Sequence, residues 1–226
     1  MHICFDQAEL RFGDRVALQP LTLSLREPRI GVIGLNGSGK TSFARLIAGL
    51  AKPTSGKVSL DGLDTVIDEK PARAKTGFIF QNPGNQIILP NIREDIALGP
   101  KSRGLAAAEV ERRVDEALAR FGIGDLGTRR PHELSGGELQ LAALAAVCVN
   151  RPELIIFDEP TNQLDLKNRA RVKAAIEGLA EQAIVISHDL DLVADFGRVL
   201  VFDQGALAFD GMGHEAVVRY REIAGC

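Results

Sequence analysis

Residues 34–41, with the sequence GLNGSGKT, constrain this chain more than any other segment. They satisfy the pattern GxxxxGK[ST] and lie between an apolar, strand-like run at 29–34 and a helix-like run at 42–50. Glycines in such a loop let backbone N–H groups surround phosphate oxygens, and the helix N-terminus adds a partial positive charge. The pattern predicts a phosphate-binding loop in which Lys40 contacts the terminal phosphates and the Thr41 hydroxyl is a ligand of Mg²⁺. A chance Gly-rich turn is the alternative, and the flanking elements argue against it.

Strand-like and helix-like runs alternate along most of the chain, which predicts an α/β fold with a parallel-sheet core. Residues 83–151 carry no strand signal and are expected to form an inserted helical subdomain, bracketed by Pro83 and Pro131. The predicted strands cover 21–25, 29–34, 57–62 with its turn, 76–80, 154–157, 183–187, 198–202 and 206–209, and the predicted helices cover 42–50, 91–99, 105–121, 167–180 and 213–222.

A second pattern, LIIFDE at residues 154–159, is an apolar strand that ends in two acids. Asp158 is expected to help hold Mg²⁺, and Glu159 to orient and deprotonate the attacking water. Strand ends are often acidic, so this pattern is weak by itself. Its position 118 residues after Lys40 in an α/β chain strengthens it.

A third pattern, LSGGE at residues 134–138, opens the apolar helix that runs through Val149. Ser135 is suited to cap this helix and to donate to a phosphate, and the glycines allow close backbone approach. Considered by itself, the segment is only a good helix start. Together with the other two patterns it resembles the signature motif of ATP-binding cassette proteins, which is usually LSGGQ.

Further residues match that family's pattern one by one. Gln81 ends a predicted strand as the family's Q-loop glutamine does, which implies contact with Mg²⁺ and the attacking water. Residues 163–165, QLD, resemble the D-loop that crosses to a partner subunit. His188 in ISHD matches the switch histidine that contacts the γ-phosphate. Phe12 lies where the family commonly has an aromatic residue stacked on adenine, and a core phenylalanine of a strand is the alternative.

The resemblance covers nearly the whole chain and implies the fold of an ABC ATPase nucleotide-binding domain. That fold is a RecA-like P-loop core with an antiparallel β subdomain and an inserted helical subdomain. The expected organisation is a single domain, 1–226, in which 1–82 and 152–226 form the core with its β subdomain, and 83–151 form the helical subdomain with the signature motif. The implied nucleotide-binding residues are Phe12, Gly34, Asn36, Gly37, Ser38, Gly39, Lys40, Thr41, Ser42, Ser135, Gly136, Gly137 and Glu138, the implied Mg²⁺ ligands are Thr41, Gln81 and Asp158, and the implied catalytic residues are Glu159, His188 and Gln81.

In this family the phosphate loop of one subunit faces the signature loop of another, so that two ATP molecules lie between two chains. One complete set of motifs therefore implies a dimer, and we favour a homodimer over a heterodimer with a close relative. The resemblance implies that the substrate is ATP and that the cofactor is Mg²⁺.

The segment GFIFQNPGNQ at 77–86, continued by NIREDIALG at 91–99, is similar to energy-coupling-factor transporters and their cobalt and nickel relatives. Those complexes contain a transmembrane coupling protein and a substrate-binding membrane protein, which are the implied partners here. Ile87, Ile88 and Leu89 are candidates for the groove that accepts the coupling protein, and packing within the helical subdomain is the alternative. The helix after the signature, LQLAALA, departs from the QRVAIARAL-like pattern of many importers and resembles the biotin-transporter branch. Biotin is the preferred substrate, with cobalt or nickel as the alternative.

Charge and composition limit the other possibilities. The net charge is −3, so we expect no nucleic-acid partner. Cys4, Cys148 and Cys226 form no CxxC or Cys/His cluster, which fits a reducing cytosol. No signal peptide or membrane-spanning run is apparent, so we expect a soluble protein that other chains hold at the cytoplasmic face of the cell membrane. A soluble ABC ATPase of an assembly machine is the remaining rival.

Overall fold

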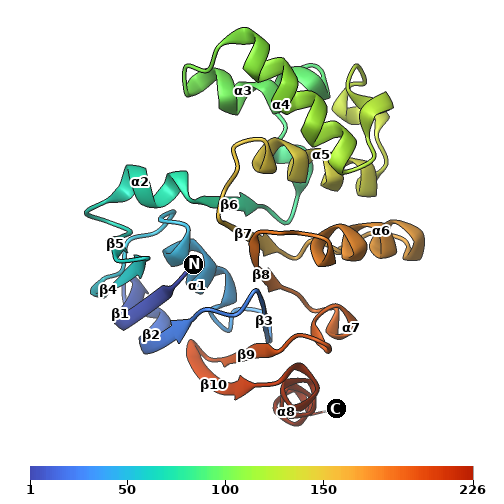
Figure 1. The fold of residues 1–226 in the computed structure, drawn as a ribbon. Coiled ribbons are helices and arrows are strands. Elements are labelled where there is room, and N and C mark those ends of the chain that lie inside the picture. Colours follow the sequence, from blue (N-terminus) through green and yellow to red (C-terminus); the bar gives the residue numbers. More distant parts are fainter. Residues whose placement is uncertain (226) are drawn as a thin grey trace. The chain divides into compact units, whose positions relative to one another are not determined.

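The structure is a computed structural model that describes residues 1–225. Its contacts divide the chain into two compact units. The first comprises Met1–Gly77, Glu153–Glu159 and the residues from Glu181 onward, and the second comprises Phe78–Pro152 and Pro160–Ala180. Nearly all strands belong to the first unit, whereas the second is mostly helical (Figure 1).

A six-stranded sheet has the order β10-β9-β3-β8-β7-β6. Strand β3 lies in its interior, parallel to β8 on one side and to β9 on the other, and β7 is parallel to β8. Every residue of β7 and β8 is buried, as expected for parallel strands that are covered on both faces. The strands are β3 Arg29–Gly34, β6 Thr76–Ile79, β7 Leu154–Asp158, β8 Gln182–Ile186, β9 Arg198–Asp203 and β10 Ala206–Gly211.

Strand β10 lies at the edge of this sheet, outside its parallel core. It pairs antiparallel with β9, and Ala206 lies opposite Asp203. The two residues between them, Gln204 and Gly205, have φ values of 46° and 81°. Positive φ at both central residues is typical of the tight hairpin turn that joins antiparallel strands. The sequence predicts no helix between these two strands, so the strand–helix alternation that indicates a parallel core does not extend to β10.

A second sheet of the first unit has four strands in the order β2-β1-β4-β5, with antiparallel neighbours. Leu21, Leu23 and Leu25 of β2 are buried, as their alternation with polar residues predicts. This sheet is the antiparallel part of the predicted fold class. The strands are β1 Ile3–Phe12, β2 Arg15–Leu25, β4 Ser55–Leu60 and β5 Leu63–Asp64.

The helices of the first unit include α1, which follows β3 directly. Phe43 on α1 stacks on Phe5 of β1 and contacts Phe202 of β9, with ring centroids 4.9 Å and 5.1 Å apart. These contacts fix the helix that carries Lys40 and Thr41. The helices are α1 Lys40–Ile47, α2 Glu69–Ala74, α7 Leu190–Val193 and α8 Gly213–Ala224.

The second unit is built mainly from four longer helices. On α4 the buried residues Val110, Val114, Ala117 and Leu118 form one face, as the helical periodicity predicts. Helix α3 extends three residues beyond the predicted end at 99 and includes Pro100. The helices are α3 Ile92–Ser102, α4 Ala107–Arg120, α5 Gly136–Cys148 and α6 Leu166–Glu177, and short 3₁₀ turns occur at Pro83–Asn85, Gly124–Leu126 and Pro131–Glu133.

Helix α6 belongs to the second unit because it packs against α5. The compact units are defined by packing contacts, and they place Pro160–Ala180, which include α6, in the second unit. The organisation expected from the sequence instead places all of 152–226 with the core. Those functional boundaries remain a prediction. Among residues 1–225, no helix has both the length and the apolar character that crossing a bilayer requires.

The antiparallel sheet offers a test of backbone strain at Gly56. This residue has a φ of 69°, and a Cβ there would collide with the backbone carbonyl of Gln7. We expect Gly56→Ala to lower the free energy of unfolding by about 2–3 kcal/mol, as strain and collision combine. Gly62 is the matched control, since its φ is 85° but nothing lies within 4 Å of the added Cβ. Urea denaturation of both variants should show the larger loss for Gly56→Ala, and equal losses would contradict the collision.

Candidate nucleotide-binding site

The loop between β3 and α1 has the backbone that its glycines predict. Gly34, Gly37 and Gly39 have φ values of 152°, 78° and 106°, which side chains rarely allow. A Cβ at Gly34 would collide with the carbonyl oxygen of Phe202. The turn between β9 and β10 also holds the loop, because the Gly205 N–H donates to the Ser38 carbonyl at 3.0 Å. Gly205 in turn accepts from the N–H of Gln19 on β2 at 2.8 Å.

The start of α1 is suited to bind an anion. Its N-cap, Gly39, supplies no side-chain hydrogen bond to the first turn. The N–H groups of that turn thus keep their partial positive charge for a ligand. The Ser38 hydroxyl is buried and has no hydrogen-bond partner among residues 1–225, which is unusual for a buried polar group. Asn36 is exposed at the tip of the loop, and Ser42 lies half-buried in the first turn.

Lys40 reaches across the loop that precedes it. Its Nζ donates to the carbonyl oxygens of Gly34 and Leu35 at 2.7 Å and 2.9 Å. Burial lowers the pKa of this ammonium, and the nearby Glu159 and Asp158 carboxylates act in the opposite direction. A buried cation that donates to neutral carbonyl oxygens is well placed to exchange these bonds for bonds to phosphate oxygens.

Thr41 and Asp158 form an oxygen-rich pair at the end of β7. The Thr41 hydroxyl donates to Asp158 Oδ1 at 3.3 Å. Burial raises the pKa of Asp158, while the Thr41 hydrogen bond, Arg45 and Lys40 lower it. Hydroxyl and carboxylate oxygens suit Mg²⁺, which usually takes few protein ligands and completes its shell with water and phosphate. Residues 1–225 contain no group of three or more His, Cys, Asp or Glu side chains that could hold a metal ion.

Glu159 and His188 lie together although they are 29 residues apart in sequence. The His188 N–H donates to Glu159 Oε2 at 3.0 Å, and His188 Nε2 lies 3.1 Å from Glu159 Oε1. Glu159 has a φ of 57°, and its own N–H donates to the Ile186 carbonyl at 3.0 Å. Backbone strain of this kind clusters at functional sites.

Burial shifts the pKa values of this pair in opposite directions. It raises the pKa of Glu159, with Asp158 and Asp189 adding to the effect and the His188 N–H and Lys40 opposing it. Burial, followed by the charge of Lys40, lowers the pKa of His188. A carboxylate with a raised pKa is a better proton acceptor, and the lowered pKa of His188 favours its neutral imidazole form.

Phe12 is not a core residue. It ends β1 opposite Arg15, and its side chain is 58% exposed. Arg15 lies beside the phosphate loop, because its Nη2 is 3.5 Å from where a Cβ of Gly37 would be. The hairpin that carries Phe12 therefore borders the loop, which is compatible with the predicted contact to a base. Arg15 itself was missed by the sequence patterns, since nothing in RFGDR marks it as a neighbour of residue 37.

The signature segment lies in the second unit. Ser135 is the N-cap of α5, and with Glu138 it forms a reciprocal pair of side-chain-to-backbone bonds. Gly136 and Gly137 open the helix, and a Cβ on Gly137 would lie 2.6 Å from the Cβ of Asn168. The glycines thus permit close approach of α5 and α6.

A cavity of about 380 Å³ in the second unit is lined by residues of the predicted Q-loop, signature loop and D-loop. It brings Gln81 together with Gly136 of the signature and with Gln163 and Leu164 of the predicted D-loop. Gln140 also lines it, and its buried Nε2 has no hydrogen-bond partner within residues 1–225. Gln81 and Ser135 both lie in the second unit, and their roles toward a nucleotide remain predictions.

Strand, phosphate loop, helix and an acidic strand end together define a P-loop protein that binds a nucleoside triphosphate. The family model "ABC transporter" matches residues 18–162. The chain therefore belongs to the ABC transporter family and is an ATP hydrolase of the ATP-binding cassette type. This confirms the family and the fold class that the sequence motifs indicate.

Two relatives and one solved structure are especially informative. The chain is 62% identical to the biotin transport ATP-binding protein BioM of Rhizobium etli, over 99% of this chain and 100% of that protein. It is 37% identical to the energy-coupling factor transporter ATP-binding protein EcfA1 of Latilactobacillus sakei, over 88% of this chain and 73% of that protein. The structure of cbiO1 from Clostridium perfringens, described as part of the ABC transporter complex cbiONQ, aligns with a TM-score of 0.86 at 27% identity. That alignment covers 98% of this chain and 94% of cbiO1.

Proposed function

We propose that this chain is the ATP-hydrolysing subunit of an energy-coupling-factor importer that takes up biotin. The observation that carries the proposal is the 62% identity to BioM of Rhizobium etli over 99% of this chain and 100% of that protein. The likeness to EcfA1 and to cbiO1 supports the same class of transporter. The partners are a second copy of this chain, a transmembrane coupling protein and a substrate-binding membrane protein, with no nucleic acid. The chain works at the cytoplasmic face of the cell membrane.

In the proposed cycle, Lys40 and the N-terminus of α1 bind the phosphates of ATP, and Phe12 contacts the base. Thr41, Asp158 and Gln81 would hold Mg²⁺, which neutralises charge on the phosphate oxygens when bound. Glu159 takes a proton from the attacking water, and His188 contacts the γ-phosphate. Ser135 and the glycines that follow it complete the ATP site of the partner subunit.

Closure of the dimer couples ATP binding to movement of the membrane partner. Two ATP molecules draw the subunits together because phosphate charge is shared between Lys40 of one chain and the Ser135 loop of its partner. Closure moves the helical residues 83–151, and with them the coupling protein. Ile88 is 69% exposed, whereas Ile87 is buried, so Ile88 is the better candidate for contact with that protein. Hydrolysis lets the dimer reopen.

The test is uptake together with association. The tagged chain should be recovered from detergent-solubilised membranes with a coupling protein and a small membrane protein, and deletion of its gene should abolish uptake of labelled biotin. Recovery with soluble assembly proteins alone would contradict the transport proposal. Uptake of cobalt or nickel in place of biotin would contradict the choice of substrate.

The raised pKa of Glu159 predicts a pH dependence. Glu159 accepts a proton only when it is ionised, so kcat should fall as the pH is lowered through its pKa, which lies above the ordinary value of 4.5. Steady-state kcat at saturating ATP, measured from pH 4.5 to 8, should show this acid limb above pH 4.5. Circular dichroism at each pH separates this limb from unfolding. A rate that is constant down to pH 4.5 would contradict the assignment.

A further inference from the structure

The hydroxyl of Ser135 is already engaged within its own chain. Its Oγ donates to Glu138 Oε2 at 2.7 Å, and its backbone N–H donates to the same oxygen at 2.8 Å. The Glu138 N–H completes the pair by donating to Ser135 Oγ at 3.4 Å. A hydroxyl has one hydrogen to donate, so Ser135 cannot donate to a phosphate while it donates to Glu138.

The charge of Glu138 adds a second obstacle. Its carboxylate is bonded to Ser135, the residue to which the proposed function brings the γ-phosphate of the ATP held by the partner subunit. Two anions that share one donor repel each other. The proposed contact therefore requires that the carboxylate leave Ser135 or that a cation offset its charge.

Helix α6 places a cation next to this position. Gly137 packs directly on Asn168, and Gly136 would bring a Cβ to 3.0 Å from Leu164 Cδ2. Asp165, the N-cap of α6, accepts from the N–H and from Nδ2 of Asn168 at 2.8 Å and 3.0 Å, which fixes the helix start. One turn further along each helix, Leu141 of α5 and Arg171 of α6 line the same groove.

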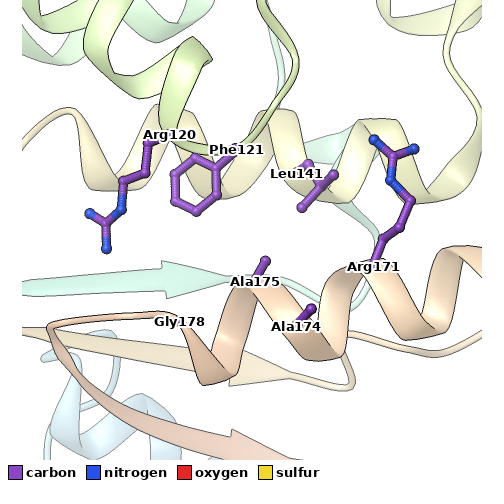
Figure 2. A pocket seen from close by; sticks show the side chains of 7 residues that line it. All are labelled: Arg120, Phe121, Leu141, Arg171, Ala174, Ala175 and Gly178. Atoms are coloured by element: carbon purple, nitrogen blue, oxygen red, sulfur yellow. The ribbon is translucent and has the colours of Figure 1, made fainter.

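Leu141 and Arg171 line a groove of about 310 Å³ in the second unit. Figure 2 shows the Arg171 side chain extending from α6 towards α5, with Arg120 and Phe121 at the other end of the groove. Both arginines are exposed. The pKa of Glu138 is lowered first by its bonds to Ser135, and then by the charges of Arg171 and Arg129. Arg171 lies on α6 one turn after Asn168, the residue on which Gly137 packs, and Glu138 follows Gly137 on α5.

We propose that Arg171 is a positioning residue for the signature loop: it takes over the Glu138 carboxylate when a phosphate arrives, which frees the Ser135 hydroxyl to donate to that phosphate. The inference rests on the proposed function, because it assumes that Ser135 meets ATP bound by the partner subunit. Arg171 touches no reacting atom in this scheme and acts only through Glu138.

A double-mutant cycle tests this coupling. Arg171→Met keeps the apolar stem that packs beside Leu141 but removes the charge. In the assembled transporter we expect it to raise the KM for ATP about 3- to 30-fold, with kcat changed less than about twofold, because it weakens a contact made on binding. Arg171→Lys should restore most of the loss. In a Glu138→Gln background, Arg171→Met should have no effect, since the charge on which it acts is gone.

Arg120→Met is the matched control, because Arg120 lies in the same groove but over the Phe121 ring, 5.2 Å from its centroid. It should leave KM unchanged. An equal rise in KM with Arg171→Met in both backgrounds, or no rise in either, would overturn the inference. Failure of the unmodified chain to bind ATP or to dimerise with it would instead contradict the proposed function.

Discussion

Replacing Glu159 with glutamine is expected to slow ATP turnover by about 10²–10⁴-fold while ATP binding is retained. Glutamine has the same shape, and its Oε1 can still accept from the His188 N–H that Glu159 binds at 3.0 Å. It cannot take a proton from water, so the chemical step alone is lost. A chain that binds ATP but does not hydrolyse it should also remain in the closed dimer.

Two measurements separate these effects. Phosphate release in the assembled transporter reports turnover, and size-exclusion chromatography of the chain with Mg-ATP reports the closed dimer. Glu153→Gln is the control, because Glu153 precedes the opposite end of β7 and pairs with Lys75 at 3.0 Å, away from the phosphate loop. Turnover of Glu159→Gln equal to that of the unmodified transporter would remove Glu159 from the mechanism.

The second large effect is expected at Lys40. Lys40→Met should weaken ATP binding about 10²–10³-fold, because it removes charge-assisted hydrogen bonds from a buried site. The methionine stem preserves most of the packing volume. Calorimetric titration with ATP measures the affinity directly.

The controls for Lys40→Met must distinguish a loss of ATP affinity from a loss of structure in the phosphate loop. Lys57→Met removes an exposed lysine whose Nζ pairs with Asp6 Oδ2 at 3.7 Å. This substitution should leave the ATP affinity unchanged. Thermal unfolding of Lys40→Met without nucleotide should stay close to that of the unmodified chain. Undiminished ATP affinity in a folded Lys40→Met chain would show that the phosphates bind elsewhere.

Local patterns predicted those parts of the site that lie within one turn or loop. The GLNGSGKT loop, the helix after it and the N-cap at Ser135 depend on neighbouring residues, so sequence spacing is enough to identify them. The LIIFDE pattern related Asp158 and Glu159 to the same chemistry, and the family resemblance added His188. The structure places all three with Lys40 in the first unit.

Features that depend on distant residues were not predictable in the same way. The hydrogen bond between Glu159 and the His188 N–H requires β7 and β8 to be adjacent in the sheet. The hydrophobic periodicity of a sequence predicts strands, but it does not predict which strands are neighbours. The packing of Gly137 on Asn168 depends on the approach of two helices. Helix α3 continues through Pro100, although proline is expected to end a helix, and local patterns place the end earlier.

The bond between Gly205 and the back of the phosphate loop has a consequence for how the protein is made. Ser38 is synthesised long before Gly205. Strand β3 also pairs with β8 and β9, which are both synthesised near the end of the chain, so β3 has no sheet neighbour until then. Contacts between residues so far apart form late, because the chain between them must first be ordered. During translation, the phosphate loop acquires its final support only when the β9–β10 turn has left the ribosome. A truncated product that ends before this turn would carry every nucleotide motif and still lack the finished loop.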